Sequence, residues 1–213
     1  MDKVFNGIVI FGEMGAGKDE LANQICVLRE KAKIYKISVL CREMMKVSKI
    51  NPRWRGQERY IGQTVADKIR ELDVNIMCDY ILALIYENWQ GKYGWDNSGL
   101  EDDEYKEALL EQLAVIRNEE IPVIVGGRTF TDLHYWKTKG YLVIGVKISE
   151  EVRYERLISR DGEATVNNSS SEHNTESEVP YIIHNLCDEV ILNDGTIEDL
   201  RSAAENILTK YNF

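Results

Sequence analysis

The segment GEMGAGKD at residues 12–19 constrains the fold of this chain more than any other feature, and it directly follows the apolar run GIVIF. Its outer glycines and its lysine match the spacing G-x-x-x-x-G-K of a phosphate-binding loop. In such a loop backbone N–H groups surround a phosphate, and the positive end of the following helix points at the same anion. The loop needs a strand before it and a helix after it, and the apolar patterns of residues 4–11 and 18–31 predict both.

Short apolar segments alternate with helical patterns along the rest of the chain. This alternation predicts an α/β domain, a three-layer sandwich whose parallel sheet of about five strands is covered by helices on both faces. After residues 4–11, the predicted strands are 33–40, 121–127, 141–148 and 188–194. After residues 18–31, the predicted helices are 41–50, two within 56–90, 101–119, 130–139, 149–162 and 196–211. The first helix within 56–90 is expected to carry Val65, Ile69, Leu72 and Ile76 on one face.

We expect a single domain over residues 1–213, because the sequence shows no internal repeat and no second pattern of strands. A helical segment at about 41–120 and a polar segment at 162–178 are then appendages of one core. The polar segment is rich in Ser and Asn, which predicts a mobile loop. Because ligands of parallel sheets bind at the carboxyl ends of the strands, we expect the functional residues there.

The charge and the cysteines argue against several classes of function. The net charge of −10 disfavours nucleic acid as the main partner, because that partner is itself an anion. The four cysteines include no C-x-x-C pair, which argues against a zinc site and a disulfide framework. No stretch approaches the ~20 apolar residues of a membrane span. The chain is therefore predicted to be cytoplasmic and without a membrane partner, and no pattern predicts its oligomeric state.

The absence of other signatures narrows the class of nucleotide-binding protein. A regulatory GTPase is expected to carry an N-K-x-D motif and an ABC-type ATPase an S-G-G-Q type signature, and the chain has neither. The remaining large class is the small kinases, which phosphorylate a nucleotide or another small phosphate-bearing metabolite.

Four arginines are placed to serve such a reaction. Phosphoryl transfer to an anionic acceptor needs cations around the transferred group, because charge neutralisation is most of the catalysis. Arg128 directly follows the third predicted strand, while Arg153, Arg156 and Arg160 are spaced i, i+3 and i+7 on one face of a predicted helix. A solvated face paired with nearby glutamates is the alternative, and it is most open for Arg153. Asp132 is placed either to hold the guanidinium of Arg128 or to form a plain surface pair.

Several segments of the chain resemble the phage and bacterial deoxynucleoside monophosphate kinases, within the adenylate-kinase-like group of P-loop kinases. The clearest are GEMGAGKDE, YKISVLCREMMK, the stretch from VIVGGRTF through SRDG, and DEVILNDGTIEDL; ERYIGQTVADKIRELD is similar more loosely. Animal-type phosphomevalonate kinases and dephospho-CoA kinases look like relatives. The resemblance spans nearly the whole chain. It implies a P-loop NTPase fold of the nucleoside monophosphate kinase type, an acceptor-binding insertion at about 41–120, a short lid at about 153–180, and ATP and Mg²⁺ as ligands.

The resemblance also implies roles for individual residues. The residues expected to bind ATP are Gly12, Glu13, Met14, Gly15, Ala16, Gly17, Lys18, Asp19, Glu20, Asn193 and Gly195. The residues expected to bind the acceptor are Ser38, Arg42, Arg59, Gln63, Arg70 and Arg128. The cations expected to act in catalysis are Lys18, Arg128, Arg156 and Arg160.

Two positions depart from the usual pattern. The loop ends in Asp19 where a hydroxyl is common, although G-K-D also occurs in the family that the chain resembles. The third strand ends in Gly126 and Gly127, where such kinases commonly have an Asp that helps to hold Mg²⁺. An acid ~4 Å from a phosphate charge costs about 4 kcal/mol at an effective dielectric near 20, unless a cation or water intervenes. We therefore expect Asp19 to hold Mg²⁺, directly or through a water; the alternative is that it only favours the first turn of its helix.

The predicted acceptor is a small phosphorylated molecule, with a nucleoside or deoxynucleoside monophosphate as the main candidate. Two alternatives remain open. One is a kinase for another phosphorylated metabolite, such as dephospho-CoA or a phosphomevalonate-like acid, although the D-x-D that dephospho-CoA kinases typically carry after the second strand is absent. The other is a nucleotide-binding sensor that does not catalyse transfer.

Overall fold

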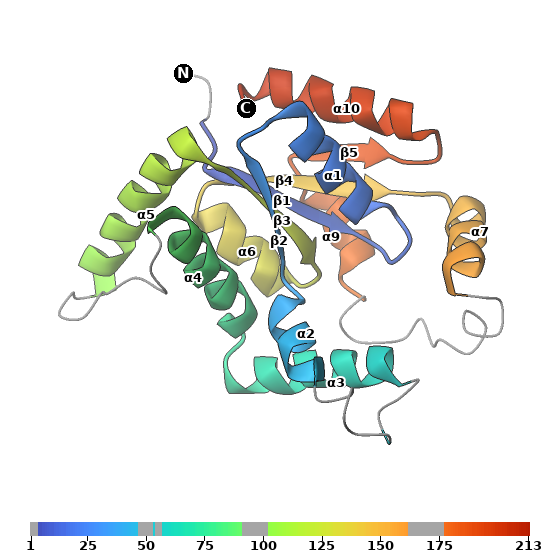
Figure 1. Cartoon of the computed structure of the whole chain (residues 1–213), viewed down its shortest axis with the longest axis horizontal. Coiled ribbons are helices and arrows are strands. Elements are labelled where there is room, and N and C mark those ends of the chain that lie inside the picture. The colour runs from blue at the N-terminus through green and yellow to red at the C-terminus, as the bar shows by residue number, and fades with distance from the viewer. Residues whose placement is uncertain (1–3, 47–52, 54–56, 91–101, 162–176) are drawn as a thin grey trace.

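A parallel five-stranded sheet forms the centre of the protein, whose computed structural model describes residues 4–46, 53, 57–90, 102–161 and 177–213. The strands are β1 (Gly7–Gly12), β2 (Ala32–Lys36), β3 (Ile121–Gly127), β4 (Tyr141–Lys147) and β5 (Glu189–Leu192). Their order across the sheet is β2-β3-β1-β4-β5, and every neighbouring pair is parallel (Figure 1). The predicted α/β class and the predicted number of strands are confirmed.

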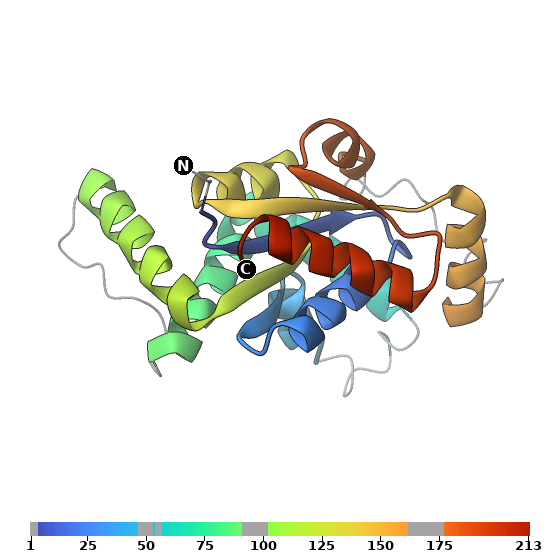
Figure 2. The same ribbon diagram turned by 90° about the horizontal axis from the view of Figure 1, so that it is seen from above.

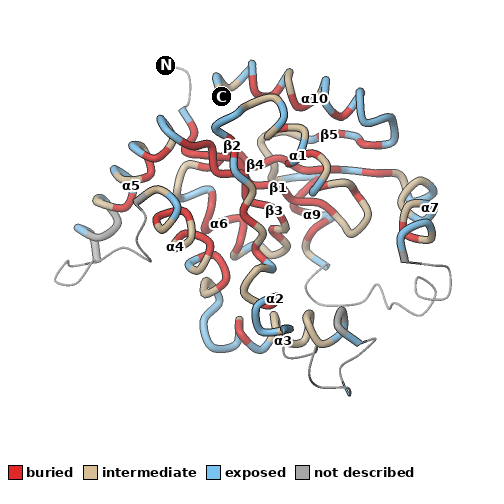
Figure 3. The backbone as a smooth tube through the Cα atoms, in the orientation of Figure 1, coloured by how far each residue is buried: buried red, intermediate tan, exposed pale blue. Residues whose placement is uncertain are grey.

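Helices cover both faces of the sheet, as the continuous apolar runs of the central strands require. On one face α1 (Lys18–Leu28) and α10 (Ile197–Lys210) pack on one apolar cluster. On the other face α4 (Ile76–Gln90), α6 (Phe130–Thr138) and α9 (Val179–Asn185) pack on a second cluster, together with α5 (Asp102–Glu119). Figure 2 shows the sheet between these two layers, and Figure 3 shows buried backbone concentrated in the sheet.

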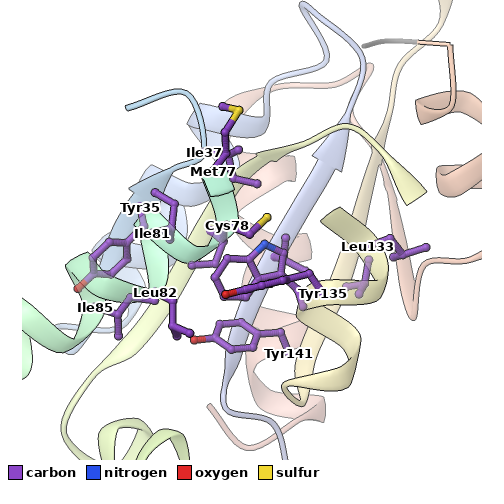
Figure 4. Close-up of a cluster of buried hydrophobic side chains, with 14 of the residues drawn as sticks. Tyr35, Ile37, Met77, Cys78, Ile81, Leu82, Ile85, Leu133, Tyr135 and Tyr141 are labelled. Atoms are coloured by element: carbon purple, nitrogen blue, oxygen red, sulfur yellow. The ribbon is translucent and has the colours of Figure 1, made fainter. Parts of the chain in front are cut away.

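The core beneath α4 and α6 is rich in aromatic side chains. Trp136 is completely buried, and its ring centroid lies 5.0 Å from that of Tyr135 and 4.8 Å from that of Tyr141, both in edge-to-face geometry. Figure 4 shows Ile81, Leu82 and other α4 side chains packed against this group. The packing ties α4, which belongs to the long segment between β2 and β3, to the sheet itself.

Two predicted elements differ from the structure. The second strand ends at Lys36, and α2 (Val39–Met45) begins where the strand was predicted to continue to residue 40. The helix α3 (Glu58–Leu72) ends at Leu72, so the prediction that Ile76 shares a face with it was wrong. The cause is a turn in which the backbone N–H of Asn75 donates to Asp73 Oδ1 at 2.7 Å, which favours a chain reversal over a further helical turn.

The helix α9 was not predicted at all, because its seven residues give too short a pattern to read as a helix. Pro180 in its first turn is the signal that marks its start. It follows α7 (Glu150–Asp161), which agrees closely with the predicted helix at 149–162. Most of the predicted mobile loop, residues 162–176, lies outside the described residues. The single-domain prediction, with its insertion and lid, therefore stays a prediction.

All four cysteines carry free thiols, and two of them, Cys41 and Cys78, are buried. Burial raises the pKa of both thiols, so they stay protonated at neutral pH. Among the helices that the structure describes, none has the length and apolar character needed to cross a membrane.

We predict that Gly127→Ala destabilises the protein, because a Cβ at this position lies 2.4 Å from Phe11 Cζ in the fully buried centre of the sheet. Overpacking of this kind costs about 1–3 kcal/mol in the free energy of unfolding, which urea denaturation measures. The matched control is Gly62→Ala in the interior of α3, where the nearest atom to a new Cβ is Met45 Cγ at 4.0 Å. There the change to alanine should raise the free energy of unfolding by about 0.5–1 kcal/mol, because glycine destabilises a helix interior relative to alanine. Equal effects of the two substitutions would contradict the packing around Phe11.

Candidate functional site

The strand order creates a crevice at the carboxyl ends of β1 and β3. The two strands are neighbours, but the chain leaves β1 toward α1 on one face and leaves β3 toward α6 on the other. Such a reversal opens a space between the two outgoing loops, and this is where open α/β sheets bind their ligands. The phosphate loop is one wall of this crevice, since it joins the end of β1 to the start of α1.

The loop has the backbone geometry of an anion site. Gly17 immediately precedes α1 with φ 92°, a left-handed conformation that a residue with a Cβ adopts only with strain. Because α1 begins at Lys18, the N–H groups of its first turn face the loop. The Lys18 side chain is 8% exposed, and its Nζ donates to the carbonyl oxygens of Gly12 at 2.6 Å and Glu13 at 2.7 Å. These bonds fold the ammonium over the loop.

The helix α7 packs directly on the phosphate loop. Arg153 Nη1 lies 3.3 Å from Glu13 Oε1, and a Cβ placed on Gly15 would meet the side chains of both Leu157 and Arg153 within 3.3 Å. Arg153 therefore does not lie on a merely solvated face of α7. It contacts the loop, although its role in the sequence interpretation was the most open of the three α7 arginines.

The end of β5 closes the other side of the loop. Asn193 is 5% exposed, and its Nδ2 donates to the carbonyl oxygen of Ala16 at 2.8 Å. Arg156 Nη2 reaches the carbonyl oxygen of Gly195 at 3.4 Å. Between these groups lies a cavity of about 280 Å³. Its lining residues are Gly15, Gly17, Glu20, Arg156, Asn193, Gly195, Thr196, Ile197 and Leu200.

A larger cavity of about 430 Å³ lies on the opposite side of the crevice, under α2 and α3. Five of the six residues predicted to bind an acceptor line it: Ser38, Arg42, Gln63, Arg70 and Arg128. The remaining wall is mostly apolar and comprises Ile37, Cys41, Met45, Gly62, Ala66, Met77 and Gly126. The structure thus brings three arginines and a mostly apolar wall together around one cavity. The side chain of Arg59 lies outside the described residues.

Asp132 holds one side of this cavity in place. Its carboxylate is 1% exposed and accepts hydrogen bonds from the backbone N–H groups of Arg128 at 2.9 Å and Thr129 at 3.2 Å. Arg70 Nη2 lies 3.4 Å from the same carboxylate, which joins α3 to the start of α6. The interpretation of Asp132 as a plain surface residue is therefore wrong. A Thr-x-x-Asp capping box at residues 129–132 is the sequence signal for its backbone bonds.

Asp19, the unusual last residue of the loop, has a partner that the sequence interpretation missed. Lys36 Nζ at the end of β2 lies 2.5 Å from Asp19 Oδ1. The Asp19 side chain is 61% exposed, so the pair lies at the solvent-accessible surface rather than in the core. No sequence motif around Lys36 predicts this contact, because it depends on how β2 and α1 pack.

The glycines at the end of β3 have structural reasons to be glycines. Gly126 has φ 98° beside an irregularity in the β1–β3 register, and Gly127 packs against the ring of Phe11. An aspartate at either position would meet backbone strain or a clash. Across the described residues no group of three or more His, Cys, Asp or Glu side chains is placed to hold a metal ion.

Two further predicted residues, Glu20 and Arg160, lie at different places relative to the cavities. Glu20 lines the smaller cavity and its Oε1 accepts a hydrogen bond from Gln24 Nε2 at 2.6 Å. Arg160 is exposed in the last turn of α7, and neither cavity includes it in its lining. Of the three α7 arginines, Arg156 lines the smaller cavity, and the other two line neither of these two cavities.

Comparisons with known proteins give distant likenesses. The chain matches no family model. It is 28% identical over 211 residues to a UPF0200 protein of Sulfurisphaera tokodaii, covering 95% of this chain and 96% of that protein. A solved protein of Eubacterium ventriosum, described as uncharacterized, has a TM-score of 0.49 at 16% identity and covers 99% of this chain and 98% of its own. The APS kinase of Mycobacterium tuberculosis, solved with AMPPNP and APS, has a TM-score of 0.46 at 10% identity. The match covers 97% of this chain and 98% of that kinase.

We predict that Asn193→Ala lowers the free energy of unfolding by about 1–3 kcal/mol, because it leaves the buried carbonyl oxygen of Ala16 without this donor. The control is Asn185→Ala, whose exposed amide bonds only to the carbonyl of Tyr181 one turn earlier. Urea denaturation of both variants compares the two losses. A cost for Asn193→Ala no larger than that of Asn185→Ala would show that the link between β5 and the loop is not stabilising.

Proposed function

We propose that this protein is an ATP-dependent kinase that phosphorylates a nucleoside or deoxynucleoside monophosphate. The observation that carries the proposal is the presence of two cavities, one beside the phosphate loop and a larger one that reaches the end of β3 and is lined by Arg42, Arg70 and Arg128. A donor and an anionic acceptor need such an arrangement, because the transferred group must lie between them and near cations.

The smaller cavity suits the ATP nucleoside. It opens beside Gly15 and Gly17, so a nucleotide whose phosphates lie in the loop has its base and sugar near Asn193, Gly195 and Ile197. Ile197 is 57% exposed and offers an apolar surface for a base. Lys18 is proposed to leave its carbonyl partners for the outer phosphates, where its charge is needed.

The larger cavity suits the acceptor. Arg42 and Arg128 are proposed to bind its phosphate, and guanidinium groups match phosphate oxygens in a bidentate manner. Ser38 and Gln63 supply hydrogen-bonding groups, while Ile37, Met45 and Met77 supply an apolar wall for a flat ring. Arg70 is proposed to bind the acceptor with one face while Asp132 holds it in position. Arg59, whose side chain lies outside the described residues, is kept as a looser acceptor contact that the resemblance implies.

The reaction needs no protein base on this proposal. An oxygen of the acceptor phosphate attacks the γ-phosphorus of ATP, the bond from that phosphorus to the bridging oxygen breaks, and ADP leaves with the electron pair. Arg156 and Arg160 of α7 are proposed to approach the transferred group when the lid at about 153–180 closes and excludes water. Arg156 is already adjacent to the loop, since it lines the donor cavity.

Mg²⁺ is proposed as the cofactor, and the carboxylate of Asp19 is a suitable ligand for it. Mg²⁺ commonly takes one or two protein carboxylates and otherwise waters and substrate phosphates. Asp19 is an exposed carboxylate in the first turn of α1, directly after Lys18. When bound there, the ion would neutralise charge on the donor phosphates. The partners proposed are small phosphorylated molecules, with neither nucleic acid nor a membrane among them, and the location proposed is the cytoplasm.

A different phosphorylated metabolite remains the second candidate for the acceptor. The three arginines recognise a phosphate and do not by themselves identify what carries it. The third candidate is a sensor that binds a nucleotide without transfer. One assay of ADP formation separates the three.

We predict ADP formation when the protein and Mg-ATP are mixed with at least one of the common nucleoside or deoxynucleoside monophosphates. Arg42→Met should raise the KM for that acceptor about 10–100-fold, because a charge-assisted bond to phosphate is lost, while ATP affinity stays unchanged. The matched control is Arg201→Met on the exposed face of α10. Turnover only with dephospho-CoA or a phosphomevalonate-like acid would favour the second candidate. ATP binding without turnover of any acceptor would favour the sensor.

We predict that Asp19→Ala raises the Mg²⁺ concentration needed for half-maximal activity about tenfold, since a direct or water-mediated carboxylate ligand is removed. Calorimetric ATP titrations at several Mg²⁺ concentrations give a second readout that is independent of turnover. Glu30→Ala, at an exposed position just beyond the far end of α1, is the control for loss of an acidic group. An unchanged Mg²⁺ requirement would rule out the metal role of Asp19.

A further inference from the structure

The ion pair between Lys36 and Asp19 lies at a position of special consequence for a phosphate loop. Asp19 is the residue after Lys18, where such loops usually present a hydroxyl to the metal that accompanies the nucleotide. Here that place carries a full negative charge. The nucleotide phosphates proposed to bind in the loop are also negative, so the Asp19 carboxylate repels them.

The fold delivers a lysine to this acid from a separate strand. Tyr35 on β2 and Ile37 just after its end are buried in the cluster under α4, so by alternation along the chain Lys36 points to the other face, toward α1. Its backbone pairs with Val125, the residue before Gly126, and Gly126 lines the acceptor cavity. Lys36 is thus held at the end of the sheet, between the start of α1 and the acceptor cavity.

The distance between Lys36 and Asp19, and the rigid elements that carry them, indicate a defined ion pair. The Lys36 side chain is 35% exposed, and the 2.5 Å separation from Asp19 Oδ1 is that of a charge-assisted hydrogen bond. Both ends are attached to rigid elements, β2 and the first turn of α1. A cation therefore stands beside the loop without any metal ion.

We propose that Lys36 is the fixed counter-charge of Asp19, a positioning residue that lets an acid stand beside the donor phosphates. The inference rests on the proposed donor site. With Lys36 in place, the pair contributes little net charge, so the loop binds a nucleoside triphosphate even where no divalent ion neutralises it. Without Lys36, Asp19 repels the triphosphate, and the repulsion grows with the number of phosphates and falls when Mg²⁺ is present.

The test is calorimetric binding of ATP, ADP and AMP, each measured with EDTA and again with Mg²⁺. Lys36→Met should weaken ATP binding in EDTA at least about tenfold, ADP binding less and AMP binding least, with smaller losses in Mg²⁺. Lys36→Arg keeps the charge and should stay within about threefold of wild type. The double variant Asp19→Ser/Lys36→Met removes both charges and should return to within about threefold of wild type, because nothing then repels the phosphates.

The matched control is Lys33→Met on the same strand, which removes a lysine paired at 2.6 Å with Glu120. Glu120 precedes β3 at the opposite end of the sheet, so this substitution should alter stability and leave ATP binding unchanged. It separates loss of a β2 ion pair from loss of charge at the loop.

Three results would overturn the inference. Unchanged ATP affinity in Lys36→Met would show that the lysine does not compensate the acid. A double variant as weak as Lys36→Met would show that Lys36 acts on the phosphates and not through Asp19. Equal losses for ATP and AMP would show general damage to the fold. Failure of the wild-type protein to bind ATP would instead refute the donor site and with it this inference, while absence of kinase turnover leaves the binding result intact.

Discussion

The buried carboxylate of Asp132 is the interaction on which the larger cavity depends. A carboxylate at 1% exposure is costly unless its oxygens are hydrogen-bonded or paired. Two backbone N–H groups at the start of α6 and the guanidinium of Arg70 provide that stabilisation. One charge therefore places α3 relative to the sheet and orients Arg128, which leaves β3 through the same turn. The cavity walls come from distant parts of the sequence, and Asp132 is where they meet.

Much of this architecture follows from local sequence patterns. The five strands were predictable because each is a short apolar or alternating segment bounded by polar or glycine-rich residues. The loop at residues 12–19 also requires a strand before it and a helix after it. The five acceptor-cavity residues were selected together from a resemblance, and the structure brings them into one cavity. Their roles in binding stay predictions, as do those of the loop residues.

The features that escaped sequence analysis depend on contacts between elements. Lys36 was invisible as a site residue because its significance comes from the packing of β2 against α1, and a lysine at a strand end is ordinary in itself. Asn193 was predicted to bind ATP, but the bond from its amide to the loop backbone at Ala16 was not predicted, because no local pattern reveals it. The end of α3 was misjudged because Ile76 continues the apolar period of that helix, while the turn at Asp73 and Asn75 decides the chain direction.

The distribution of charge reconciles an acidic protein with the anionic ligands that we propose for it. A net charge of −10 repels phosphates at long range, but exposed charges beyond about 10 Å are largely screened in salt. Affinity then depends on the charges within the crevice, where Lys18, Arg156 and the three cavity arginines are gathered. Three of the acids in this region are each paired with a cation: Glu13 with Arg153, Asp19 with Lys36 and Asp132 with Arg70. Glu20 instead accepts a hydrogen bond from Gln24. Pairing leaves the crevice net positive, and it fixes the side chains that line it.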